Sequence, residues 1–167
     1  MADNPSATTV SVVVPAWNAG EDLDRCLAAV FGSDYPLAEV IVVDDASTGP
    51  STAEIARRHG AKLLRMPRQS GPGQARNLGA REASGEVLLF TDADVVLHPD
   101  AIGKAVAALD ADPKVAAVFG SYDDRPAHPS LLSRYRNDDH ARDVRERWLP
   151  PLLRSINAIA SGMRNTG

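Results

Sequence analysis

The fold is indicated first by residues 40–47, Val40-Ile41-Val42-Val43-Asp44-Asp45-Ala46-Ser47. Four β-branched apolar residues in a row predict a short strand that is buried on both faces of a sheet. The acidic turn that follows marks the end of this strand. Outward from it, similar apolar runs predict further strands at residues 10–14, where Pro15 is expected to stop the strand, and at 61–65, 86–91 and 115–119.

The segments between these runs carry apolar residues at helical spacing. They predict helices over residues 21–31, 52–59, 73–83 and 99–109. Gly60 is well placed to end the second helix. In the third helix, Ala75, Gly79 and Ala83 would permit close packing on a sheet. Alternating strands and helices predict an α/β domain with a mostly parallel sheet flanked by helices, whose ligands bind beyond the carboxyl ends of the strands.

Composition and charge bound the domain organisation. The α/β domain is expected over residues 10–120, after a polar, flexible N-terminus at 1–9 that lacks the apolar core of a signal peptide. Residues 121–167 are expected to form a loop and a helical tail. The helical spacing of the tail shows in an apolar stripe of Leu152, Ile156, Ile159 and Met163. The single cysteine, Cys26, occupies an apolar helix position and is expected to be a buried hydrophobic residue.

The same features exclude several classes of function. A net charge of −4 over 167 residues argues against nucleic acid as a partner. No apolar run is long enough to span a bilayer. A single cysteine suits a reducing compartment, so we expect a cytoplasmic location. A place at the cytoplasmic face of a membrane is expected only if a longer parent protein associates with that membrane.

An acidic pair follows the fourth predicted strand as Thr91-Asp92-Ala93-Asp94. Carboxylate oxygens are the ligands that Mg²⁺ and Mn²⁺ prefer, and a cation held by one or two of them keeps positions free for phosphates. Such a cation would stabilise a diphosphate leaving group. The alternative is that both aspartates only cap a turn or the following helix.

Two further stretches supply candidate ligands for a nucleotide. Asp45, after the second strand, could accept the ring N–H of uracil or guanine, whereas Asp44 is assigned to a local turn. The stretch Gly71-Pro72-Gly73-Gln74-Ala75-Arg76 is a glycine-rich turn that leads into a helix and could present N–H groups to phosphate. Arg76 is either a contact to base or diphosphate or a solvated arginine.

Taken together, these motifs and Val12-Val13-Val14-Pro15-Ala16-Trp17-Asn18 resemble the family 2 glycosyltransferases, in the order and at the spacing of that family. The resemblance runs from about residue 10 to about residue 136. It implies a Rossmann-like GT-A fold and an inverting transfer from a nucleotide-diphosphate sugar, with a UDP-sugar favoured, to an acceptor hydroxyl of a glycan or lipid. It implies that Pro15, Ala16, Asn18, Asp45, Arg76 and Asp92 bind the nucleotide and that Asp94 holds Mg²⁺ or Mn²⁺.

A general base is the part of this machinery that the resemblance does not supply. Members of the family place a carboxylate well downstream of the acidic pair, and residues after about 140 carry no family motif, so the chain looks like a truncated, donor-binding part. Asp138 and Asp139 are weak candidates for the base, since surface ion pairs explain them as well. An inactive nucleotide-sugar-binding fragment is therefore the alternative function.

Two other α/β classes are disfavoured by where the polar residues stand. A phosphorelay receiver would carry its acidic pair after the first strand and a lysine after the fifth, but here the pair follows the second strand and Gly120-Ser121-Tyr122 follows the fifth. A sugar-nucleotide pyrophosphorylase would carry a basic glycine-rich loop after the first strand, which Pro15-Ala16-Trp17-Asn18 does not provide.

Overall fold

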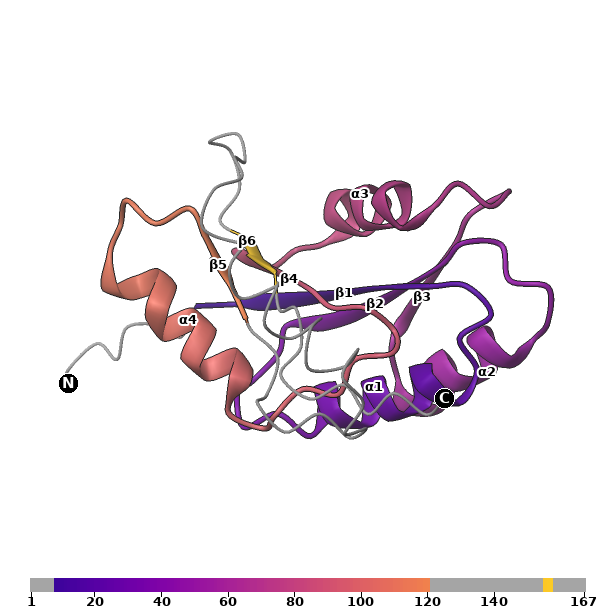
Figure 1. The fold of residues 1–167 in the computed structure, drawn as a ribbon, viewed down its shortest axis with the longest axis horizontal. Helices are drawn as coiled ribbons and strands as arrows, with labels where there is room; N and C mark the ends of the chain where they lie inside the picture. The colour runs from indigo at the N-terminus through magenta and orange to yellow at the C-terminus, as the bar shows by residue number, and fades with distance from the viewer. Residues whose placement is uncertain (1–7, 121–154, 158–167) are drawn as a thin grey trace, which may run out of the picture.

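The computed structural model describes residues 8–120 and the backbone of residues 155–157 (Figure 1). The strands are β1 Val10–Ala16, β2 Glu39–Asp44, β3 Lys62–Arg65, β4 Val87–Phe90, β5 Ala117–Phe119 and β6 Ser155–Asn157. The helices are α1 Glu21–Phe31, α2 Ser51–His59, α3 Pro72–Glu82 and α4 Ala101–Ala111. The strands form one sheet in the order β3-β2-β1-β4-β6-β5, and neighbouring strands are parallel. The predicted alternation is confirmed.

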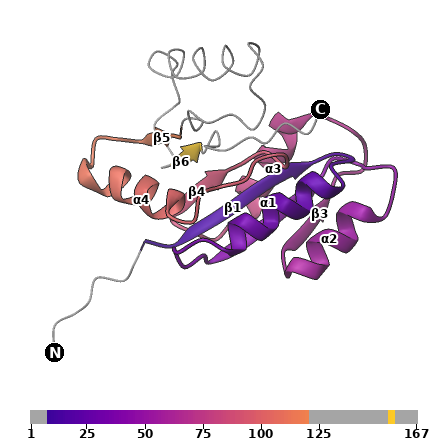
Figure 2. The same cartoon turned by 60° about the horizontal axis from the view of Figure 1, so that its bottom comes forward.

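Helices cover both faces of the sheet. In Figure 1, α3 lies above the sheet and α1, α2 and α4 lie below it, and Figure 2 shows α1 and α2 side by side. Because successive strand residues point to opposite faces, Val12 and Val14 of β1 pack with Leu27 of α1, whereas Val13 packs with Ala75 of α3. This double burial explains why the central strands β1, β2 and β4 are mostly apolar.

The close approach of α3 depends on small residues. Ala75 and Gly79 are buried against β1 and β2, and a Cβ atom added at Gly79 would stand 2.3 Å from Cγ1 of Val13. The predicted packing of this helix is thus confirmed. At the end of α2, Gly60 has a left-handed backbone with φ of 79°, which confirms it as the residue that ends that helix.

Pro15 does not stop the first strand, contrary to expectation, because β1 continues to Ala16. The C=O groups of Val10 and Ala16 accept bonds on the β2 side, and the C=O of Val13 accepts one from Thr91 on the β4 side. By this alternation Pro15 faces β4, whose pairing with β1 ends at Val13. Its missing N–H therefore leaves the pairing with β2 intact.

The helical expectation for the apolar stripe of the tail is wrong at Ser155–Asn157, which form β6 between β4 and β5. Backbone groups along the edges of β4 and β5 require hydrogen-bond partners, and a strand inserted there satisfies both edges. This pairing overrides a local helical spacing. The rest of the predicted loop and tail, and residues 1–7, lie outside the described residues.

Candidate functional site

The candidate site lies where β1, β2 and β4 end. Because these strands are parallel neighbours, their carboxyl ends meet at one edge of the sheet. Ala16 pairs with Asp44, so the loops after β1 and β2 start side by side. The loop after β1 carries Asn18, the loop after β2 carries Asp45, and the segment after β4 begins with Thr91 and Asp92. The strand order thus brings the predicted nucleotide-binding residues to one edge.

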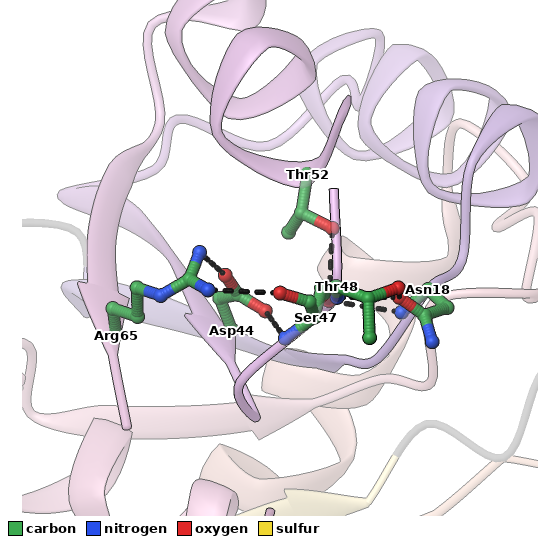
Figure 3. Close-up of polar contacts among 6 residues, drawn as sticks. All are labelled: Asn18, Asp44, Ser47, Thr48, Thr52 and Arg65. Atoms are coloured by element: carbon green, nitrogen blue, oxygen red, sulfur yellow. Dashed lines mark hydrogen bonds and ion pairs between the residues drawn. The ribbon is translucent and has the colours of Figure 1, made fainter. Parts of the chain in front are cut away.

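Ser47 and Asn18 join the first two loops, as Figure 3 shows. The Asn18 N–H donates to Oγ of Ser47 at 2.9 Å, and the Thr48 N–H donates to Oδ1 of Asn18 at 3.0 Å. The Thr52 hydroxyl also donates to Oγ of Ser47, at 3.2 Å. Asn18 and Ala46 have positive φ angles of 50° and 61°. Such backbone is uncommon for residues other than glycine, and these side-chain bonds help to hold it.

Asp44 supports the second loop from inside the protein. Its carboxylate is buried, and Oδ1 accepts the Ser47 N–H at 2.8 Å. Arg65 then donates from Nη1 to Oδ2 of Asp44 and from Nη2 to the Ser47 carbonyl, both at 2.8 Å (Figure 3). The local-turn role predicted for Asp44 is confirmed. Sequence reasoning missed Arg65, because only the register that pairs Asp44 with Arg65 reveals the contact.

Asp45 holds the loop that leads into α3. It is 4% exposed. Its Oδ1 accepts the Ser70 N–H and its Oδ2 accepts the Gly71 N–H, each at 2.8 Å. Asp45 stands at the strand end where a contact to the nucleotide base was predicted. Its carboxylate also makes contacts to the loop before α3, which the sequence did not indicate. Each carboxylate oxygen has a second lone pair, so these bonds do not exhaust its capacity to accept hydrogen bonds.

Arg76 and Asp92 come together across the site. Arg76, on α3, donates from Nη2 to Oδ1 of Asp92 in an ion pair. Nε of Arg76 is buried and has no hydrogen-bond partner within the described part of the chain. An unsatisfied buried donor is costly. The Arg76 side chain as a whole is 32% exposed, so part of the guanidinium remains open to a ligand while Asp92 holds it in place.

Asp94 lies in a region of concentrated negative charge. Partial burial raises the pKa of its carboxyl, and the charges of Asp92 and Asp22 raise that pKa further. Residues 8–120 contain no group of three or more His, Cys, Asp or Glu side chains placed to hold a metal ion. Asp92 and Asp94 suit a divalent cation that takes its other ligands from phosphate and water. A bound cation would also relieve their repulsion.

Residues beside the acidic pair complete this end of the site. Cys26 is buried and its thiol lies 3.4 Å from the Asp92 carbonyl oxygen. Burial and the charges of Asp94 and Asp92 raise the pKa of Cys26 to about 12. The thiol therefore stays protonated at neutral pH, and the prediction of a buried hydrophobic residue is confirmed. Oγ1 of Thr91 is buried without a partner in the described chain.

The end of β1 and the residue after it differ in exposure. Pro15 and Ala16, expected to line the nucleotide, belong to β1 and are both buried. Trp17, which follows them, is 50% exposed. The sequence motif that contains Trp17 gave this residue no role. A large aromatic residue directly after a buried strand is the signal that could have marked Trp17 as a candidate. The two candidates for the general base, Asp138 and Asp139, lie outside the described residues.

A cavity of about 460 Å³ lies at the opposite edge of the sheet, between the end of α1 and the starts of β2 and β3. Its charged side chains already have partners. Glu39 accepts bonds from the hydroxyls of Ser11 and Ser84, and the Lys62 ammonium lies 3.7 Å from the Glu82 carboxylate. Both charged side chains of this cavity are thus engaged by groups of the protein itself.

The fold is an α/β domain of the GT-A class, with its polar candidate site at the carboxyl edge of the sheet. The chain belongs to glycosyl transferase family 2, because the model of that family matches residues 11–164. The match continues past residues 136–140, where the sequence motifs end. The expectation that the family resemblance stops there is therefore wrong. Residues after about 140 match the family model although they contain no short sequence motif of the family.

Individual proteins give the same result. The chain is 36% identical over 107 residues to the glycosyltransferase AglE of Haloferax volcanii, covering 60% of this chain and 35% of that protein. The mannosyltransferase PcManGT of Pyrobaculum calidifontis, solved with GDP-Man and Mn²⁺, superposes with a TM-score of 0.62 at 33% identity, over 68% of this chain and 35% of that one. S. aureus TarS, solved with UDP-GlcNAc, superposes with a TM-score of 0.62 at 27% identity. The superposition covers 73% of this chain and 36% of that chain.

The chain thus spans about a third of the length of these relatives. Within residues 8–120, no helix combines the length and the apolar character needed to cross a bilayer.

Proposed function

We propose that this chain binds a nucleotide-diphosphate sugar together with Mg²⁺ or Mn²⁺ and serves inverting glycosyl transfer to an acceptor hydroxyl. A UDP-sugar is the favoured donor. The observation that carries the proposal is the meeting of Asn18, Asp45, the Arg76–Asp92 ion pair and Asp94 at the carboxyl edge of one parallel sheet. The GDP-Man and UDP-GlcNAc complexes of the two structural relatives support it.

The proposed roles divide the edge into a nucleoside side and a phosphate side. The half-exposed Trp17 offers an aromatic surface for a base or sugar, and Asn18 and Asp45 lie on the same side. Arg76 is suited to a diphosphate, because its partly exposed guanidinium carries several N–H donors in one plane. Asp94, with Asp92 beside it, would hold the cation, which would stabilise the charge that develops on the leaving diphosphate.

Transfer needs more than donor binding. Inversion requires a base that removes the proton of the acceptor hydroxyl, a contribution of roughly 10²–10⁴-fold in rate. The alternative function is therefore donor binding without transfer, and an assay of nucleotide release separates the two. Acceptor-dependent release from UDP-sugars or GDP-sugars would establish transferase activity in residues 1–167. Slow release that candidate glycan and lipid acceptors do not accelerate would favour the alternative.

The proposal is tested by calorimetric titration of the chain with UDP and with GDP, each in Mn²⁺ and in EDTA. We expect Mn²⁺-dependent binding, tighter for UDP than for GDP. Asp94→Ala is expected to remove the Mn²⁺ dependence. Asp34→Ala, an exposed residue in the loop between α1 and β2 at the opposite edge, is the matched control and should bind as the unchanged chain does. Binding that neither EDTA nor Asp94→Ala weakens would contradict the metal assignment.

A further inference from the structure

Arg65 stands apart from the motifs, at the last position of β3, and its guanidinium is the common anchor of the loops that form the donor site. Nη1 and Nη2 each make a 2.8 Å bond, one to the Asp44 carboxylate and one to the Ser47 carbonyl. The Asp44 side chain is fully buried, whereas the Arg65 side chain is 52% exposed. One arginine thus neutralises a buried carboxylate and fixes the backbone three residues further along.

The contacts continue from Ser47 to the loop after β1. Its hydroxyl accepts the Asn18 N–H, and Asn18 returns a bond to the Thr48 N–H (Figure 3). Both loops contain a residue with a positive φ angle, at Asn18 and Ala46. Backbone of this kind persists where surrounding bonds determine it. Releasing the Ser47 carbonyl would therefore free both loops to relax.

The contacts also continue from Asp44 to the loop before α3. Asp45 follows Asp44 directly, and its carboxylate holds the N–H groups of Ser70 and Gly71. The direction of the Asp45 side chain depends on the backbone that Asp44 and Arg65 fix. The loops after β1, after β2 and before α3 are in this way tied to one guanidinium.

We infer that Arg65 is a positioning residue for nucleotide binding, which acts through Asp44 and Ser47 on Asn18 and Asp45 without contacting the nucleotide. This inference rests on the proposed function for its ligand. It assigns Arg65 to the nucleoside side of the site, away from the cation at Asp94. Replacing Arg65 should consequently weaken UDP binding by the same factor with and without Mn²⁺, whereas Asp94→Ala should act only in Mn²⁺.

Arg65→Met is the direct test, but it leaves Asp44 as an unpaired buried charge that could destabilise the whole fold. The double variant Arg65→Met/Asp44→Asn removes that charge and keeps an amide oxygen for the Ser47 N–H. It still lacks the bond to the Ser47 carbonyl. Arg81→Met, an exposed arginine in the last turn of α3, is the matched control.

Three measurements are made on each variant: the free energy of unfolding in urea, UDP affinity in Mn²⁺ and in EDTA, and hydrogen exchange of the Asn18, Ser47 and Thr48 amides. We expect the double variant to regain much of the stability that Arg65→Met loses. Its UDP affinity should nevertheless stay about tenfold below that of the unchanged chain, the effect of losing a charge-assisted contact. The three amides should exchange faster than in Arg81→Met.

A double variant that binds UDP as tightly as the unchanged chain would overturn the inference, since Arg65 would then affect stability alone. Amide exchange equal to that of Arg81→Met would overturn it as well. If the unchanged chain binds neither UDP nor GDP, the proposed function fails. The exchange measurement then still decides whether Arg65 holds the loops, because it needs no ligand.

Discussion

Asp45 illustrates at the scale of a residue how a side chain proposed to bind a ligand can also hold the architecture. Its carboxylate is nearly inaccessible and accepts two backbone N–H groups from the loop before α3. Charge-assisted bonds of this kind are among the stronger contacts in proteins. Any nucleotide that reaches Asp45 meets a carboxylate that is already rigidly oriented, which lowers the entropy lost on binding.

Replacing Asp45 by asparagine should therefore reduce stability as well as binding. The amide keeps one acceptor oxygen, so the N–H of Ser70 or Gly71 loses its partner. We expect a loss of about 1–3 kcal/mol in the free energy of unfolding, measured in urea, together with weaker binding of UDP. The exposed Asp34→Asn serves as control. An unchanged free energy of unfolding in Asp45→Asn would mean that the loop before α3 is held by other contacts.

Asp94 shows the opposite balance between stability and function. Burial and the charges of Asp92 and Asp22 raise the pKa of its carboxyl. A group with a raised folded-state pKa binds protons more tightly in the folded than in the unfolded chain. Its ionised form therefore lowers stability at neutral pH. This penalty declines as the pH falls below the folded-state pKa, and it is gone below the unfolded-state pKa.

Asp94→Asn should consequently raise the melting temperature at about pH 7 and leave it nearly unchanged at about pH 3, while Mn²⁺-supported binding of UDP is lost. Asp100→Asn is a control of opposite sign, because a hydrogen bond from Lys104 lowers the pKa of Asp100. That variant should be slightly less stable at neutral pH. Thermal unfolding at the two pH values checks both. A lower melting temperature for Asp94→Asn at neutral pH would contradict the electrostatic account.

At the scale of elements, sequence periodicity predicted the bounds of the helices and strands of residues 10–119 to within about two residues, the extension of β1 beyond Pro15 included. Apolar runs and helical spacing are local properties, so they are visible in the sequence. Strand β6 and the Arg65–Asp44 contact depend on which strands become neighbours. That information is not local, and the sequence alone did not reveal either feature.

Helix α3 tests the packing account directly. Alanine favours a helix over glycine by about 1 kcal/mol, yet a Cβ at Gly79 would clash with Val13. We expect Gly79→Ala to destabilise the protein by about 1–3 kcal/mol in urea, as overpacking typically does. Gly73→Ala, where a Cβ meets open space, should be neutral or stabilising. Equal stability of the two variants would show that α3 shifts freely over the sheet.

At the scale of the whole molecule, the sheet order explains why the site is at one edge. Strand β1 lies between β2 and β4, so the loops that follow these three strands are neighbours although they are far apart in the sequence. The charged side chains of the cavity at the opposite edge, Glu39 and Lys62, are already held by Ser11 and by Glu82. The central claim is accordingly one of location: the nucleotide and its cation bind at the carboxyl edge.

Paramagnetic broadening of backbone amide signals by Mn²⁺ in the presence of UDP tests this claim most directly. The account predicts that the Ala93 and Val95 amides broaden most, that those of Asn18 and Ser47 broaden less, and that those of Glu39 and Lys62 at the opposite edge do not change. Asp94→Ala should abolish the pattern. Broadening centred on Glu39 and Lys62, or the same pattern in Asp94→Ala, would contradict it.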